Sequence, residues 1–193
     1  MKTKQSSALT RSDYEKIYHM LDAVSPIDTD CGKLCRAVCC SQEDAGEDAG
    51  IYLLPGEASV HDKSDPWLTW WSDSVDDYDF PASWTGTVDF VRCRGAASCR
   101  RSLRPIQCRT FPLAVHLTPD GKLQMILNDM ELPYRCPLIE NGRPLNADFV
   151  RVTLEAWQLL ITDPLIRDLV EEDSRARDAD GHEYTVLFPA QNA

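Results

Sequence analysis

Two cysteine-bearing stretches stand out in the sequence: Cys31-Gly32-Lys33-Leu34-Cys35-Arg36-Ala37-Val38-Cys39-Cys40 and Arg104-Pro105-Ile106-Gln107-Cys108-Arg109-Thr110-Phe111-Pro112. Cys93 and Cys99 precede the second stretch and Cys136 follows it, which accounts for all eight cysteines of the chain. In a reducing compartment, clustered cysteines hold metal or carry out redox chemistry more often than they form structural disulfides. We therefore expect these thiols to converge as the ligands of one or two metal centres.

The length and the charge of the chain limit its domain organisation and its partners. At 193 residues it is long enough to bury an ordinary hydrophobic core. We expect one metal-binding cysteine-cluster domain over residues 1–193, with an acidic, Trp-rich insertion at about residues 58–86. The net charge of −11 argues against nucleic acid and anionic membranes as partners, because both are themselves anionic.

The location that the sequence predicts is the cytoplasm. The basic start of the chain is not followed by the apolar segment of a signal peptide. No apolar run approaches the roughly 20 residues that span a bilayer. A soluble, cytoplasmic protein would keep its thiols reduced and available to a metal.

The spacing of the first cysteine stretch limits how its thiols can share a metal. In one continuous helix, Cys31 and Cys39 would lie about 12 Å apart, at about 1.5 Å rise per residue. Two sulfurs on one zinc ion lie at most about 4.6 Å apart, since each Zn–S bond is about 2.3 Å. Either this stretch is not one straight helix, or its thiols serve two centres. The adjacent pair Cys39 and Cys40 favours two centres, because neighbouring side chains point in different directions.

Six arginines and no acidic residue lie between positions 92 and 109, in a chain that is acidic overall. They are interleaved with three cysteines, so we expect them to offset the negative charge of metal-bound thiolates. A solvated basic loop that balances the acidic insertion is the simplest alternative. A phosphate-binding patch is another.

The remaining sequence predicts helices and short strands. Apolar periodicity predicts a helix over residues 10–24, capped by Ser12 and Glu15, and two C-terminal helices over 147–163 and 165–177, the first capped by Asn146. Apolar runs predict strands at 51–54, 87–92, 112–117, 123–127 and 183–188, two of them joined by a Pro-Asp-Gly turn. The predicted fold class is α+β: a short, mostly antiparallel sheet with flanking N- and C-terminal helices around a cysteine-rich metal centre.

Residues 60–83 are acidic and rich in tryptophan, and they show no regular period. We expect their tryptophans to pack onto the body of the protein as a separate small cluster. The alternative is a patch that binds a ligand or a protein partner. Just before this segment, Glu57 follows a Pro-Gly turn. We expect a solvated carboxylate there, with an oxygen ligand near the metal as the alternative.

The cysteine pattern, closed by Arg104-Pro105, Cys108-Arg109 and Phe111-Pro112, resembles the YkgJ-type cysteine-cluster family of zinc- or iron-chelating domains. The resemblance covers roughly residues 31–137. It implies eight candidate metal ligands: Cys31, Cys35, Cys39, Cys40, Cys93, Cys99, Cys108 and Cys136. It also implies a distant relation to flagellin lysine methylases, in which a related cysteine cluster is thought to hold iron–sulfur.

Three functions follow as hypotheses. The first is a metal-binding protein in which zinc or an iron–sulfur cluster structures the fold and serves electron transfer or partner binding. The second is an iron–sulfur-dependent enzyme that modifies proteins, with its substrate near the Trp-rich segment. The third is a disulfide-rich binding domain, which the lack of an export signal disfavours.

Overall fold

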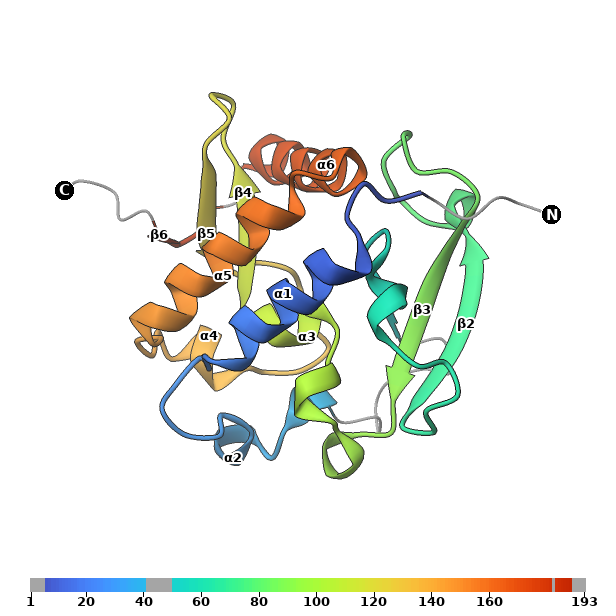
Figure 1. Ribbon diagram of the computed structural model, residues 1–193. Coiled ribbons are helices and arrows are strands. Elements are labelled where there is room, and N and C mark those ends of the chain that lie inside the picture. The colour runs from blue at the N-terminus through green and yellow to red at the C-terminus, as the bar shows by residue number, and fades with distance from the viewer. Residues whose placement is uncertain (1–5, 41–49, 182, 189–193) are drawn as a thin grey trace.

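The computed structural model describes residues 6–40, 50–181 and 183–188. Within them, helices pack against two antiparallel sheets of three strands each, with strand orders β1-β3-β2 and β4-β5-β6 (Figure 1). The α+β class is thus confirmed. The expected single sheet is instead two, because β5 pairs with β4 and β6, whereas β3 pairs with β1 and β2.

The first sheet contains a strand that the sequence did not predict. β1 (Ile51–Tyr52) and β2 (Leu68–Ser74) flank β3 (Thr87–Cys93). All seven residues of β2 pair with β3, from Leu68 opposite Cys93 to Ser74 opposite Thr87. Burial along β2 does not alternate from residue to residue, so the strand has no period of two. Its pairing comes from the distant strand β3, which local patterning does not reveal.

The second sheet follows the predicted hairpin. β4 (Leu113–Leu117) and β5 (Leu123–Leu127) pair in register, and β6 (Val186–Phe188) adds to the far side of β5. In the turn, the Thr118 N–H donates to the Lys122 carbonyl at 2.9 Å, and Gly121 takes a φ of 81°. A glycine tolerates this left-handed conformation without a steric penalty.

Three long helices cover the sheets. α1 (Arg11–Asp22) lies beside α5 (Ala147–Leu160), and α6 (Pro164–Asp180) packs on β4 (Figure 1). The N-cap of α1 lies two residues earlier than predicted, at Thr10 instead of Ser12. Its capping box consists of Thr10 and Asp13, because Thr10 takes the extended conformation that an N-cap residue requires. The predicted Asn146 cap of α5 is confirmed.

The hydrophobic core lies between these helices and the sheets. Its main part joins residues of α1, α5 and α6 to residues of both sheets. Trp84 belongs to it, and its indole N–H donates to the Leu165 carbonyl at 2.9 Å. A second, small cluster forms around Trp67, with Trp70 packed against it, so the expected separate cluster exists for these two tryptophans.

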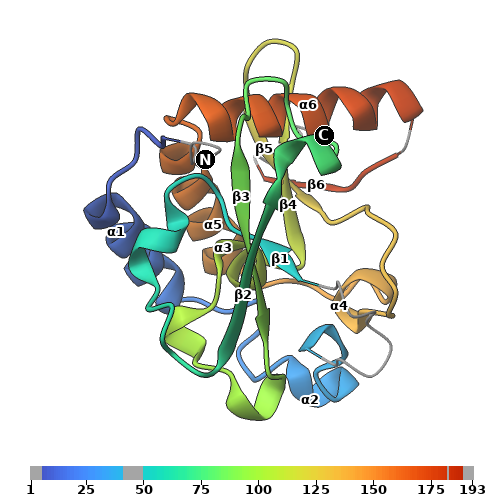
Figure 2. The same cartoon turned by 90° about the vertical axis from the view of Figure 1, so that its right-hand side faces the viewer.

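Short elements carry or adjoin every cysteine except Cys93, which ends β3, and two of them, α2 and α4, lie at the lower end of the molecule in both views (Figures 1 and 2). The short elements are α2 (Gly32–Cys35), the 3-10 helices η1 (Val38–Cys40), η4 (Ala96–Ser98) and η5 (Arg101–Leu103), α3 (Ile106–Thr110) and α4 (Pro137–Glu140). Two further 3-10 helices, η2 (Glu57–Val60) and η3 (Val75–Asp77), flank β2 in the sequence. The acidic segment 41–49 lies outside the described residues. In the part that is described, none of the helices combines the length and the apolar character needed to cross a bilayer.

Candidate metal centre

The first cysteine stretch is not one helix. α2 ends after four residues, and Arg36 and Ala37 follow with φ angles of 55° and 56°. This left-handed region is costly for residues with a Cβ atom. The Ala37 N–H donates back to the Gly32 carbonyl at 2.8 Å, and a Cβ atom on Gly32 would lie only 3.3 Å from that of Ala37. The chain therefore reverses sharply between Cys35 and η1, so Cys39 need not lie a helix length away from Cys31.

Four cysteines line one small cavity. Cys31, Cys35, Cys39 and Cys136, which we call the first set, surround a space of about 30 Å³. The other side chains of its wall are mainly apolar, and they include Phe111 and Tyr134. A space of this size holds about one water molecule or a single metal ion. Cys136 is buried at the N-cap of α4, whereas Cys39 is exposed.

The other four cysteines form a second set: Cys40, Cys93, Cys99 and Cys108. They come from η1, the end of β3, the end of η4 and α3. A Cβ atom on Gly95 would lie 3.5 Å from the Cys40 carbonyl oxygen, which places η1 against the chain between β3 and η4. Burial raises the pKa of Cys108 to about 12; Arg104 opposes this rise, and the charges of the other three thiols of the set add to it.

One contact joins the two sets directly. The sulfurs of Cys39 and Cys40 lie 3.9 Å apart, within hydrogen-bond distance of each other. This hydrogen bond lowers the pKa of Cys40 to about 6 and raises that of Cys39. Tyr134 lies next to both sets. Its pKa is raised to about 12 by burial, and then by the charges of Cys39, Cys136, Cys108 and Cys40.

The structure thus brings all eight predicted ligands near one another, but their sulfur atoms do not converge on a common metal position. No disulfide joins any of the eight cysteines, all of which lie in described segments. Among the described residues, no three His, Cys, Asp or Glu side chains form a group that could hold a metal ion as they stand. The metal centre therefore remains a prediction, and its ligands would have to move inward to close on a metal.

The arginines of the second stretch serve different purposes. Arg104 is placed to balance thiolates, since its charge lowers the pKa of Cys40, against burial, and opposes the rise in the pKa of Cys99 and Cys108. Its Nε atom is buried and has no hydrogen-bond partner among the described residues. A buried donor without a partner is costly, and an anionic metal–thiolate group beside it would supply an acceptor. In this respect the site fits such a group.

Arg109, by contrast, connects the backbone of the motif to α1. Its Nε donates to the Arg104 carbonyl at 2.6 Å, and Nη2 donates to the Ser102 carbonyl. Nη1 forms an ion pair with Asp22 at 2.7 Å, and the guanidinium lies over the ring of Tyr18 at 4.2 Å from its centroid. Its role in this structure is to hold the loop between Cys99 and Cys108, so the expectation that every arginine offsets thiolate charge is not met here.

Glu57 is the clearest correction at residue level. It is fully buried, where we expected a solvated carboxylate. Its Oε1 accepts hydrogen bonds from the Tyr18 hydroxyl and the Ile106 N–H, both at 2.7 Å, and Oε2 accepts one from the Leu54 N–H at 2.9 Å. These donors and the nearby Arg109 offset the desolvation that raises the pKa of Glu57. The carboxylate thereby fixes the start of α3, which carries Cys108.

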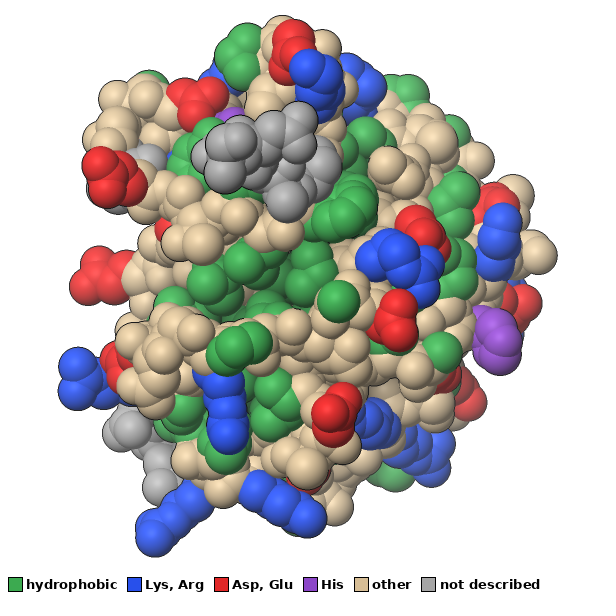
Figure 3. Space-filling view, turned by 90° about the vertical axis from the view of Figure 1, so that its left-hand side faces the viewer, with side chains coloured by type: hydrophobic (Ala, Val, Ile, Leu, Met, Phe, Trp, Pro, Cys, Tyr) green, Lys and Arg blue, Asp and Glu red, His purple; other side chains and the backbone are tan. Residues whose placement is uncertain are grey.

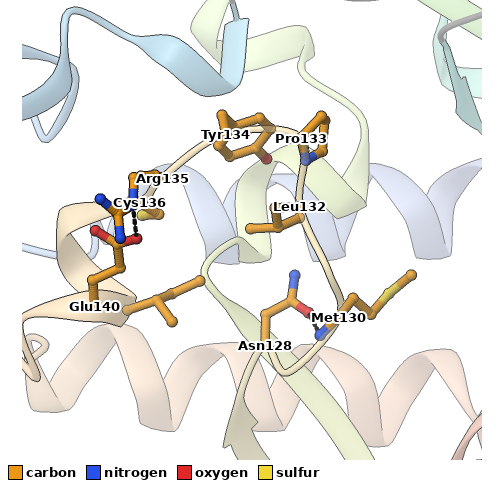
Figure 4. A pocket seen from close by; sticks show the side chains of 9 residues that line it. Asn128, Met130, Leu132, Pro133, Tyr134, Arg135, Cys136 and Glu140 are labelled. Carbon is orange, nitrogen blue, oxygen red and sulfur yellow. Dashed lines mark hydrogen bonds and ion pairs between the residues drawn. The ribbon is translucent and has the colours of Figure 1, made fainter.

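An open hollow of about 350 Å³ borders the first set at Cys136. Figure 4 shows its wall, in which Arg135 and Glu140 form an ion pair at 2.7 Å beside Cys136 while Met130 and Tyr134 lie opposite. The side of the molecule on which α4 and β6 lie also shows hydrophobic side chains gathered in a depression, with Lys and Arg below it (Figure 3). Arg104 is one of the six arginines that the sequence predicts to offset thiolate charge, whereas the position of Tyr134 next to both sets was not predicted, although its nearness in sequence to Cys136 was a usable signal.

Compared with protein-family models, with curated proteins and with solved structures, the chain matches none. The resemblance to the YkgJ-type family therefore rests on the cysteine pattern and its closing Arg-Pro, Cys-Arg and Phe-Pro pairs alone.

Proposed function

We propose that this protein binds zinc or an iron–sulfur cluster through its eight cysteines, and that the metal completes the folding of the cysteine-bearing end. The observation that carries this proposal is the gathering of cysteines from four separate parts of the chain. One part, α4, lies about a hundred positions after α2 in the sequence, yet Cys136 and Cys31 line the same cavity. Thiols without a structural disulfide rarely gather in this number for packing alone.

Most of these thiols lie on or next to short elements, which supports a structural role for the metal. Helices of three to five residues are not stable in water without contacts to the rest of the protein. A structural metal site contributes about 10 kcal/mol or more to folding, which would stabilise such a region. Because thiolate ligands need a reducing compartment, we place the protein in the cytoplasm. Electron transfer and binding of a protein partner are the roles that such a centre would serve.

The alternative is an iron–sulfur-dependent enzyme that modifies proteins, similar to the flagellin lysine methylases. The hollow of about 350 Å³ beside Cys136 favours it, since a substrate side chain could reach the first set from there. Under this alternative the cluster is iron–sulfur, and the hollow admits the substrate.

Metal analysis after anaerobic purification tests the proposal. We expect either zinc, or iron with acid-labile sulfide and visible colour. We also expect Cys108→Ser to lower the metal content and to destabilise the protein by several kcal/mol, about the share of one ligand in a site worth about 10 kcal/mol.

The control is Trp70→Ala, whose side chain packs on the small cluster around Trp67. This variant should keep the full metal content. An unchanged metal content in Cys108→Ser would exclude Cys108 as a ligand, and a wild-type protein without metal would refute the proposal.

A further inference from the structure

The eight cysteines fall into two sets by position as well as by charge. The first set lines a single cavity, to which no cysteine of the second set contributes. The second set gathers instead around the chain between β3 and α3, where Gly95 meets the carbonyl group of Cys40. The division falls between two neighbouring residues, Cys39 and Cys40.

The backbone around η1 explains how neighbouring cysteines reach different places. The reversal at Arg36 and Ala37 returns Cys39 to the cavity that Cys31 and Cys35 already line. The left-handed region is costly for residues with a Cβ atom, so the surrounding structure must enforce this conformation at two consecutive residues. The Cys40 sulfur stays 3.9 Å from that of Cys39, but Cys40 also lies near Cys99 and Cys108 of the second set.

The electrostatic neighbours follow the same division. Apart from Cys40, the thiols whose charge helps to raise the pKa of Cys39 are Cys35 and Cys31. Those that help to raise the pKa of Cys99 are Cys40 and Cys93. Because Coulomb interactions weaken with distance, thiols whose charges raise one another's pKa lie near one another.

The number of ligands in each set agrees with metal chemistry. A structural zinc site takes four ligands in a tetrahedron, and both [2Fe–2S] and [4Fe–4S] clusters take four cysteines. Each set holds four. All four cysteines of the first set line one small cavity, and Arg104, which could offset the charge of a centre, lies near Cys31 of the first set as well as near Cys108 of the second.

We propose that the eight cysteines form two separate four-thiolate centres: the first set (Cys31, Cys35, Cys39 and Cys136) holds one, and the second set (Cys40, Cys93, Cys99 and Cys108) holds the other. This inference rests on the proposed function, because it assigns the ligands of the metal that the previous subsection proposes. Tyr134 lies between the two centres, within reach of the charges of both.

The test compares double variants of the full chain. Protein is reduced, freed of metal and reloaded anaerobically with Zn²⁺, and with Co²⁺ as a coloured probe, in the presence of a competing chelator. The wild type should bind two ions per chain. Two substitutions within the first set, Cys31→Ser with Cys136→Ser, should leave one ion. One substitution in each set, Cys99→Ser with Cys136→Ser, should leave none.

The matched pair of double variants keeps the number of lost cysteines constant, so only their placement differs. Equal and non-zero metal content in the two double variants would overturn the division, because the placement would then have no effect. If both double variants bind nothing, the cause is either misfolding or a shared centre. Near-UV circular dichroism of the double variant within the first set, which reports on the packing of its tryptophans, separates these two explanations. Native dichroism without metal overturns the division. For a misfolded double variant, the single variant Cys136→Ser replaces it, and anything other than half the wild-type metal content overturns the division. A wild type that takes up no metal would instead refute the proposed function itself.

Discussion

Replacing the buried carboxylate of Glu57 by an amide should destabilise the protein by about 3 kcal/mol. In Glu57→Gln the amide oxygen can keep the two donors at Oε1, Tyr18 and Ile106. The amide nitrogen then faces the Leu54 N–H, so that two donors oppose each other in the protein interior. A buried donor without a partner costs about 1–3 kcal/mol, and the loss of charge-assisted bonds adds about 1 kcal/mol more.

Urea unfolding followed by tryptophan fluorescence measures this loss. For a chain of this length, about 3 kcal/mol corresponds to a fall in Tm of roughly 6–12 °C. The matched control is Glu155→Gln on α5, which also exchanges a carboxylate for an amide. Glu155 is only half-buried and pairs with Arg151 at 2.8 Å, so its loss should cost less than about 0.5 kcal/mol. A cost below about 1 kcal/mol for Glu57→Gln would refute the account of Glu57 as the group that fixes α3.

Two further predictions concern the contacts around Glu57. Arg109→Lys should cost about 2–4 kcal/mol in urea unfolding, because one ammonium group cannot replace a guanidinium that donates to three carbonyls and pairs with Asp22. A near-neutral result would contradict this role. Burial, and then Arg109, lowers the pKa of His61 from 6.5 to about 4. The unfolded chain therefore binds the extra proton between these values, and the stability from neutral His61 is fully present above pH 6.5 and is lost as the pH falls toward 4. The difference in unfolding free energy between wild type and His61→Gln should shrink over that range, and a constant difference would exclude it.

The sequence predicts the helices and the hairpin well because their signals are local. The apolar spacing of α1 places Tyr14, Ile17, Tyr18 and Leu21 on its buried face, and all four are buried. The Pro-Asp-Gly turn likewise identifies the β4–β5 hairpin. Both signals lie within a few residues of the element that they predict.

Structural features that depend on residues far away in the sequence are not predicted by local sequence patterns. β2 owes its pairing to β3, and Glu57 owes its burial to donors from α1 and α3. The cysteine pattern predicts that the thiols gather, but it leaves their division open. That division depends on the left-handed reversal at Arg36 and Ala37. Because neither position is a typical turn residue such as glycine, the sequence does not predict this reversal.

X-ray absorption at the metal edge of anaerobically purified protein tests the metal-centre account most directly. The account predicts a first shell of about four sulfur atoms per zinc ion at about 2.3 Å, or sulfur with an iron neighbour for a cluster. It also predicts two centres per chain. A shell dominated by oxygen or nitrogen, or a protein without metal, would contradict it.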